Sequence, residues 1–334
     1  MKIVVDAFGG DNAPSEILLG AVQAKREYDA DIVLTGGVKE MLAAAERQGF
    51  SLDGLELTDA PHVIEMQDEA RSVIKSKKDS SMGTALRMLA DGRADACVSA
   101  GPTGAYLMGA TMIVKRIKGV KRPALGAVMP GVKNPFIMVD CGANAEVRPE
   151  MLEQFGLMGS IYMSSVLGVK SPRVGLANNG SEEGKGTGLQ QQAYERMMKN
   201  ELINFVGNIE GRDIPEGVCD VVVTDGFTGN LILKTIEGMA VSVFSMLKDV
   251  LMENTRSKAA AMILKPGLKR LKTRMDYTEY GGAPLIGLTK PVIKAHGSSN
   301  AKAVKNAVRQ AMQWSAAGAA EEMEKIFERA QVER

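Results

Sequence analysis

The amino-acid sequence predicts a doubly wound α/β fold, a mainly parallel sheet with helices on both faces. The first observation is a set of short segments that are apolar at consecutive positions, as expected for strands buried on both faces. They are KIVVD (2–6), DIVLTGG (31–37), DACVSAG (95–101), FIMVDCG (136–142) and CDVVVTDG (219–226). The second is helical spacing of apolar residues between them, at 16–28, 83–94 and 151–168. Alternation of the two kinds of segment is typical of the α/β class.

The third observation is how these predicted strands end. Each leads through small and polar residues toward a helix, as in AFGGDNAP (7–14), PTGA (102–105), CGANAE (141–146) and GFTGNLILK (226–234). In open α/β sheets, ligands bind at the carboxyl ends of the strands. Several such exits therefore predict one shared pocket.

Length and composition set the frame for this fold. The 334 residues suit one large domain, 1–334, or two lobes that share one sheet, and no repeat or linker divides them. A net charge of +1 gives no overall attraction to nucleic acid. Cys97, Cys141 and Cys219 lack metal-ligand spacing and are expected to be buried free thiols. Neither a signal peptide nor an apolar segment of about 20 residues is found, which predicts a cytoplasmic protein.

The first exit, DAFGGDNAP (6–14), has few apolar residues, and Gly9, Gly10 and Asp11 are candidates for ligand contact because glycine permits close backbone approach. The fingerprint GxGxxG is absent here, which weakens a dehydrogenase interpretation. Asp6, Asp11, Asp140 and Asp225 are the residues to test as metal ligands. We expect them instead to order loops by accepting backbone hydrogen bonds, and we predict no metal and no cofactor.

The exit VSAGPTGAYLMGA (98–110) is a candidate anion site. Amide groups at a helix N-terminus bind anions and hydroxyls add donors, so Ser99, Gly101, Thr103 and Gly104 are predicted to hold phosphate. The alternative is a tight turn in which Ser and Thr only cap the helix. Pro102 removes one donor.

Two further loops carry cations. In ANNGSEEGKGTGLQQQA (177–193), Lys185 stands among four glycines and is interpreted as a phosphate clamp or lid, although a solvated lysine on a mobile loop is the alternative. It lacks the spacing of a P-loop. In VVVTDGFTGNLILKTIEG (221–238), Asp225 ends a strand, and Asn230 and Lys234 are expected on one side of the following helix.

His296, in KAHGSSNAKAVKNA (294–307), is the second of only two histidines. It is a candidate for orienting phosphate or protonating a leaving group, and a structural role at a helix start is the alternative. His62 has no chemical partners nearby in the sequence and is expected to be structural or exposed.

The segment 254–275 contains seven Lys and Arg residues and no acidic residue. After Pro266, Leu268, Leu271 and Met275 are expected on one helix face, opposite basic residues. Such an element can rest on anionic lipid or bind an acidic partner. A solvated helix that packs its leucines on the core is the alternative.

Together, DAFGGDNAP, SAGPTGA, DCGAN, VVVTDGFTGNLILKTIEG, GGAPLIGL and AHGSS resemble one family over nearly the whole chain. It is the PlsX family, the phosphate acyltransferases of bacterial phospholipid synthesis, which convert acyl-[acyl carrier protein] and inorganic phosphate into acyl phosphate. The sequence departs from the family pattern at Phe8, Asn12 and Pro102, where Met, His and Asn are usual. The lost histidine argues against a general base at position 12.

The resemblance implies a fold like that of isopropylmalate dehydrogenase and phosphotransacetylase, a homodimer, and peripheral membrane association near a downstream glycerol-3-phosphate acyltransferase. It implies that Asn144 of DCGAN, together with Gly9, Gly10, Asp11 and Asp225, contributes to the substrate site. Lys185, Asn230 and His296 are predicted to be catalytic, with Lys234 as a further phosphate donor.

Two other functions stay open at this point. One is a phosphotransacetylase-like acyltransferase that uses coenzyme A, and the other is a membrane-surface scaffold without activity. Thioester cleavage with acyl carrier protein or with coenzyme A separates the two enzymes, and liposome binding without thioester cleavage identifies the scaffold.

Overall fold

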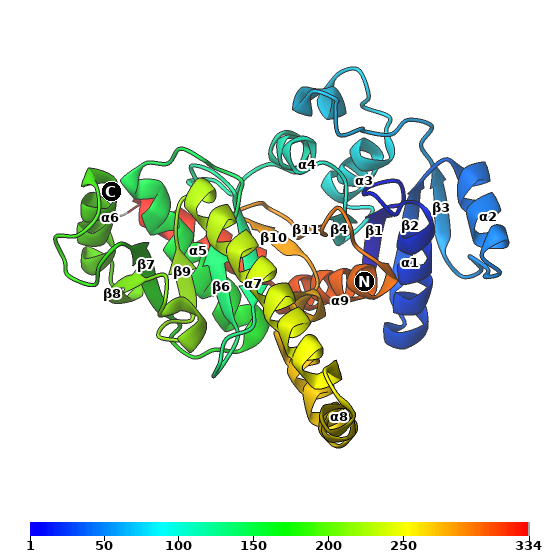
Figure 1. Ribbon diagram of the computed structural model, residues 1–334. Helices are drawn as coiled ribbons and strands as arrows, with labels where there is room; N and C mark the ends of the chain where they lie inside the picture. Colours follow the sequence, from blue (N-terminus) through cyan, green and yellow to red (C-terminus); the bar gives the residue numbers. More distant parts are fainter. Residues whose placement is uncertain (333–334) are drawn as a thin grey trace.

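Eleven strands form one continuous sheet within residues 1–332, the part of the chain that this computed structural model describes. The strand order is β3-β2-β1-β4-β11-β10-β5-β6-β9-β7-β8, and helices lie on both faces (Figure 1). Neighbours from β3 to β11 are parallel, as are those from β6 to β8. The predicted fold class is therefore confirmed.

The first half of the sheet comes mainly from the N-terminal part of the chain. Its elements are β1 (Lys2–Asp6), α1 (Ser15–Tyr28), β2 (Asp31–Gly36), α2 (Val38–Arg47), β3 (Glu56–Asp59), the 3₁₀ turn η1 (Ala70–Ile74), α3 (Ser81–Ala90), β4 (Ala96–Ser99) and α4 (Thr103–Gly109), which continues as a π-helical turn η2 (Ala110–Val114).

The second half follows, and the chain then returns. The elements are β5 (Ala124–Met129), β6 (Phe136–Val139), α5 (Pro149–Leu167), β7 (Arg173–Asn178), α6 (Gly188–Lys199), β8 (Asn204–Glu210), η3 (Ile214–Glu216), β9 (Val221–Val223), α7 (Gly226–Met252), α8 (Thr255–Met275), η4 (Tyr277–Tyr280), β10 (Ala283–Ile286), β11 (Val292–Lys294), α9 (Ala301–Ala317) and α10 (Ala319–Val332).

The middle of the sheet differs from the predicted parallel pattern. Strand β10 pairs antiparallel with both β11 and β5, and β5 pairs antiparallel with β6. The two parallel blocks consequently run in opposite directions. Because β11 lies beside β4, a strand near the end of the chain completes the half of the sheet that the first residues begin.

Apolar cores on both faces hold these layers together. Strands β1, β4, β6 and β9 are buried almost throughout, in agreement with their continuous apolar sequences. On one face α1 packs on α9, where a Cβ at Gly20 would lie 2.6 Å from the Val304 Cβ. Trp314 of α9 meets Tyr162 of α5 edge to face, with 5.6 Å between the ring centroids. Helix α9 thus connects the two halves.

Predicted and observed elements agree best where the apolar segment is long. The helix expected at 83–94 ends at Ala90, because Gly92 has a φ of 75° that turns the chain toward β4. The three cysteines are buried and free, as predicted.

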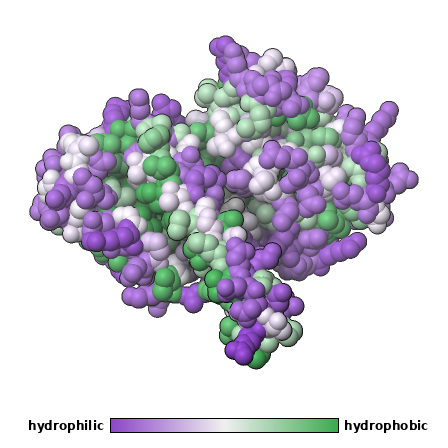
Figure 2. Space-filling view, in the orientation of Figure 1, coloured by the Kyte–Doolittle hydropathy of each residue, from purple (hydrophilic) through white to green (hydrophobic). Residues whose placement is uncertain are grey.

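Helices α7 and α8 form a hairpin that projects from the body (Figure 1). The basic segment predicted at 254–275 is α8, which continues through Pro266 and has no buried residue. Its leucines therefore do not pack on the core, which removes the alternative of a helix anchored in that way. Figure 2 shows hydrophobic and hydrophilic residues mixed at the surface of the projecting part.

Candidate active site

A cavity of about 690 Å³ lies where the two halves of the sheet meet. One wall comes from the loops after β1, β4 and β11, which are carboxyl ends of parallel strands. The opposite wall comes from β5, the exit of β6 and the first turns of α7, and the start of β10 lies between. The predicted convergence of strand exits on one pocket is thus observed.

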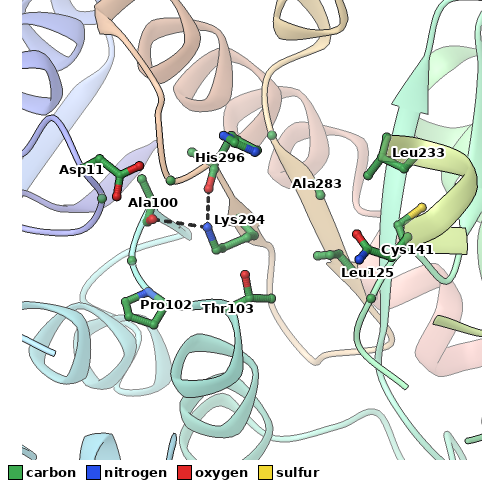
Figure 3. A pocket seen from close by; sticks show the side chains of 18 of the residues that line it. Asp11, Ala100, Pro102, Thr103, Leu125, Cys141, Leu233, Ala283, Lys294 and His296 are labelled. Carbon is green, nitrogen blue, oxygen red and sulfur yellow. Dashed lines mark hydrogen bonds between the residues drawn. The ribbon is translucent and has the colours of Figure 1, made fainter. Parts of the chain in front are cut away.

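The two ends of this cavity differ in chemistry, as Figure 3 shows. Asp11, Thr103, Lys294 and His296 lie toward one end. At the other end are the apolar side chains of Leu125, Cys141, Leu233 and Ala283. Ala127, Val128 and Met129 of β5 extend the apolar lining. The cavity can therefore accept a ligand with an anionic group and a hydrocarbon part.

Lys294 is the most deeply buried cation of the polar end, with 7% of the residue exposed. It ends β11, and its Nζ donates to the backbone oxygens of Ala100, at 3.3 Å, and Ala295. Burial lowers the pKa of the Lys294 ammonium to about 8, against the attraction of Asp6 and Asp11. At neutral pH Lys294 is mostly charged.

His296 faces the helix α7 across the cavity. Its Nε2 lies 3.2 Å from the Nζ of Lys234, which also pairs with Glu237 at 2.8 Å. An ammonium only donates, so Nε2 accepts from Lys234, and Nδ1 lies 2.8 Å from the Ser298 hydroxyl and 3.2 Å from the Ser298 amide nitrogen. Burial and the Lys234 charge lower the pKa of His296, and the ring is neutral at pH 7.

Buried carboxylates order the strand exits. Asp6 accepts from the Ser99 hydroxyl at 2.6 Å and from the Phe8 amide at 3.2 Å. Asp140 accepts from the amides of Leu125, Gly142, Ala143 and Asn144 and from the Asn144 side chain. Asp225 caps α7 by accepting from the amide and hydroxyl of Thr228. These aspartates act as predicted, through hydrogen bonds that fix loops.

Two glycines allow the backbone to approach closely at the cavity. Gly10 has a φ of 100°, and a Cβ there would lie 2.7 Å from the Gly297 carbonyl oxygen. A Cβ at Gly229 would lie 1.9 Å from the Asp140 carbonyl oxygen. The start of α7 can therefore pack directly on the exit of β6, which places Asn230 in the cavity wall.

The cavity brings together seven of the predicted site residues. They are Gly10, Asp11, Gly101, Thr103, Asn230, Lys234 and His296. Thr103 begins α4, where the first amides of a helix have no partner within the helix. Pro102 also lines the cavity, and its carbonyl accepts from the Tyr106 amide at 3.0 Å.

Other predicted residues lie outside the cavity lining. Ser99 is buried and its hydroxyl is used by Asp6, and Gly9 packs against the Gly101 amide. Asn144 donates to Asp140 and to the Pro123 carbonyl. Asp225 is the helix cap, and Gly104 faces η1 near Ala70. These five surround the lining and hold its loops.

Lys185 also lies away from the cavity. It stands on the exposed loop between β7 and α6, with its Nζ 3.8 Å from Glu182 and 48% of its side chain exposed. Lys185 is not among the residues that line the cavity.

Sequence reasoning missed Lys294, Glu237 and the apolar wall of β5. The segment PVIKAHG carried a signal for Lys294, because an apolar run there ends in a lysine immediately before a polar exit. The wall of β5 had no such signal, since nothing in ALGAVM distinguishes a cavity wall from a core strand.

Solved structures of other proteins share the fold of this chain. The phosphotransacetylase EutD from Staphylococcus aureus matches with a TM-score of 0.62 and 17% identity, covering 96% of this chain and 94% of that one. A 4-hydroxythreonine-4-phosphate dehydrogenase from Klebsiella pneumoniae matches with a TM-score of 0.55 and 13% identity, covering 94% and 99%. The chain thus has a fold shared by phosphotransacetylases and by one class of dehydrogenases.

The family is shown by closer relatives. Residues 1–322 match the family model described as "Fatty acid synthesis protein". A phosphate acyltransferase from Clostridioides difficile is 47% identical over 316 residues, which are 94% of this chain and 93% of that protein. The chain belongs to this family of phosphate acyltransferases and is an acyltransferase of lipid synthesis.

Proposed function

We propose that this enzyme transfers a fatty acyl group from acyl-[acyl carrier protein] to inorganic phosphate, giving acyl phosphate for phosphatidic acid synthesis. The observation that carries the proposal is the cavity with one polar end, which holds Lys234 and Lys294, and one apolar end. Phosphate fits the first end and the start of an acyl chain fits the second, so the thioester carbonyl would lie between them.

The chemistry needs positioning more than strong acids or bases. A phosphate oxygen attacks the thioester carbonyl carbon, and the tetrahedral intermediate collapses as the carbon–sulfur bond breaks. The acyl group leaves on phosphate, and the thiolate takes up a proton. Because phosphate is a nucleophile near neutral pH, holding it against the carbonyl and stabilising the oxyanion supply the main rate gain.

We assign roles to the residues of the cavity wall. Thr103 and the amides at the start of α4 would donate to phosphate, and Lys234 and Asn230 would donate to the oxyanion. A neutral His296 is suited to orienting phosphate or accepting its proton, and less suited to protonating the thiolate. Lys185 stays a catalytic candidate, which its own loop or a second copy of the chain would have to bring to the cavity.

The deciding experiment measures free thiol released from palmitoyl-[acyl carrier protein] with and without inorganic phosphate. We expect release only with phosphate, and formation of one palmitoyl phosphate for each thiol. An intact thioester under both conditions would contradict the proposal. A parallel reaction with palmitoyl-coenzyme A tests the second candidate, which the phosphotransacetylase fold favours. Cleavage of that thioester alone would establish it.

We further propose that the α7–α8 hairpin binds the cytoplasmic membrane surface. Contrary to the expectation that no segment approaches the apolar length of a membrane span, helix α7 is long and apolar enough to cross a membrane, by length and composition only. Its first turns, however, line the cavity through Asn230, Leu233 and Lys234 and are tied to the body. In α8, Met262 is 72% and Ile263 81% exposed beside the basic residues. A hairpin lying on anionic lipid suits these facts.

Two parts of the proposal concern other proteins. A homodimer would cover further apolar residues of α7, such as Val241 and Val250, which are 72% and 62% exposed. Peripheral attachment would deliver acyl phosphate to a glycerol-3-phosphate acyltransferase in the membrane. The alternative for α8 is a grip on the acidic acyl carrier protein.

A further inference from the structure

Lys294 is a buried cation that forms no salt bridge with any carboxylate of the described residues, although Asp6 and Asp11 attract it from farther away. No Asp or Glu oxygen of the described residues 1–332 lies within 4.0 Å of its Nζ. The carboxylate of Asp6, at the end of β1, instead accepts hydrogen bonds from the Ser99 hydroxyl and the Phe8 amide. A charged group removed from water is costly unless it is paired. The missing partner is therefore expected from outside the chain.

The Nζ atom of Lys294 lies at the polar end of the cavity. Two of its three N–H groups are used by the carbonyl oxygens of Ala100 and Ala295, both of which belong to the cavity lining. These bonds hold the ammonium between the exits of β4 and β11 (Figure 3). The third N–H is available to a ligand. Thr103, at the start of α4, lies across from it in the same view.

We propose that Lys294 is the residue that anchors the attacking phosphate, and that bound phosphate is the counter-ion that completes this buried charge. This inference rests on the proposed function. The shared chemistry is a phosphoryl oxyanion, which two sources can supply: inorganic phosphate, or the phosphodiester of the pantetheine arm on the acyl donor. We assign inorganic phosphate, because in the proposed function the thioester carbonyl would lie between the polar end that holds Lys294 and the apolar wall.

The charges around Lys294 make this anchor sensitive to pH. Asp6 on β1 and Asp11 in the following loop favour the charged form, whereas Lys234 on α7 opposes it. His296, on the loop after β11, is neutral and adds no charge. The pKa of Lys294 in the folded chain is about 8. The ammonium therefore loses its charge as the pH rises from 7 to 9, and phosphate should bind more weakly. Phosphate itself remains anionic over this range.

The test is a comparison of Lys294→Met and Lys294→Arg with the unchanged enzyme. We expect Lys294→Met to raise the KM for phosphate by ~10- to 100-fold, the range for a hydrogen bond to a charged group. The KM for the acyl donor should stay within about 2-fold. The rise in phosphate KM between pH 7 and 9 should disappear in Lys294→Met and shift to higher pH in Lys294→Arg. Lys290→Met, two residues before β11 and outside the cavity lining, is the matched control.

Each result has a distinct meaning. An unchanged phosphate KM in an active Lys294→Met enzyme would overturn the anchor, and a raised KM for the acyl donor alone would assign Lys294 to the phosphodiester instead. Calorimetric titration of inorganic phosphate into the protein without acyl donor keeps the test independent of turnover. If phosphate binds at Lys294 but no thioester is cleaved, the anchor stands and the proposed function fails. Melting temperatures of the variants exclude misfolding as the cause.

Discussion

At the scale of residues, the buried Lys294 predicts a conflict between stability and activity. Its pKa is about 8 in the folded chain and 10.5 in the unfolded one. Between these values the unfolded chain binds more protons, so folding stability rises with pH. At pH 7 the buried charge is a net cost. Lys294→Met removes this cost but also removes the two hydrogen bonds that Nζ donates. We expect the net effect at pH 7 to be a rise in the free energy of unfolding of about 1 to 3 kcal/mol.

Denaturant titration at pH 7 and pH 10 measures this effect. The gain from Lys294→Met should shrink toward pH 10, where the wild-type lysine is neutral in the folded state. A less stable variant at pH 7 would mean that the bonds from Nζ to Ala100 and Ala295 outweigh the desolvation of the charge. Residues placed for ligand binding are often the ones that reduce stability.

Lys185 gives the second prediction at this scale. If its charge stabilises the transition state, Lys185→Ala should reduce turnover by at least ~10²-fold. Lys199→Ala, at the other end of α6, removes an equivalent lysine and should have no effect. Turnover by Lys185→Ala at the wild-type rate would leave catalysis to the residues of the cavity wall, where Lys234 and His296 already meet.

At the scale of elements, α8 provides a prediction about the membrane. Replacing Lys269, Arg270 and Lys272 by Glu reverses three charges on α8. This should weaken binding to vesicles with anionic lipid by ~10- to 100-fold or more, since each basic residue near such a surface contributes about 1 kcal/mol. The same change at the exposed Lys115, Lys118 and Lys121, which lie outside the hairpin, is the matched control. Unchanged vesicle binding together with a raised KM for acyl carrier protein would assign α8 to the carrier instead.

The elements also show what a sequence can predict and why. Strands such as β1, β4 and β9 are buried on both faces, so their apolar segments are continuous and stand out. Strand β11 has only three residues, VIK, and its last one is charged. Its existence depends on pairing with β4 and β10, which are distant in sequence. For the same reason Lys294 was missed while His296, two residues later, was found.

Side-chain placement in the site was predicted less completely than the strand exits were. The exits at Gly10, Gly101 and Asn230 were found because turn residues follow apolar strands. Which polar groups face the cavity depends on hydrogen bonds between exits. Ser99 turns to Asp6 of another strand, a pairing that is not visible in either segment alone, and Asn144 turns back to Asp140 within its own strand exit.

At the scale of the whole molecule, a ligand in the cavity touches both halves of the sheet. Because phosphate would bind only the folded state, it should stabilise the protein by about 2.7 kcal/mol at 100 times its Kd. Thermal unfolding in phosphate and in chloride at equal ionic strength measures this effect. We expect the melting temperature to rise only in phosphate and the rise to be lost in Lys294→Met. Equal melting temperatures in both salts would contradict binding in the cavity.

The late position of β11 in the chain has a consequence for synthesis on the ribosome. The wall that holds Lys294 and His296 is added to β4 only after almost 300 residues have been made. Until then the edge of β4 and the face of α1 that later packs on α9 stay uncovered. An unfinished chain therefore exposes an unpaired strand edge during translation, where other chains can pair with it. Without β11 it also lacks the Lys294 wall of the proposed substrate site. The proposed site can therefore form only after β11 has been made and has paired with β4.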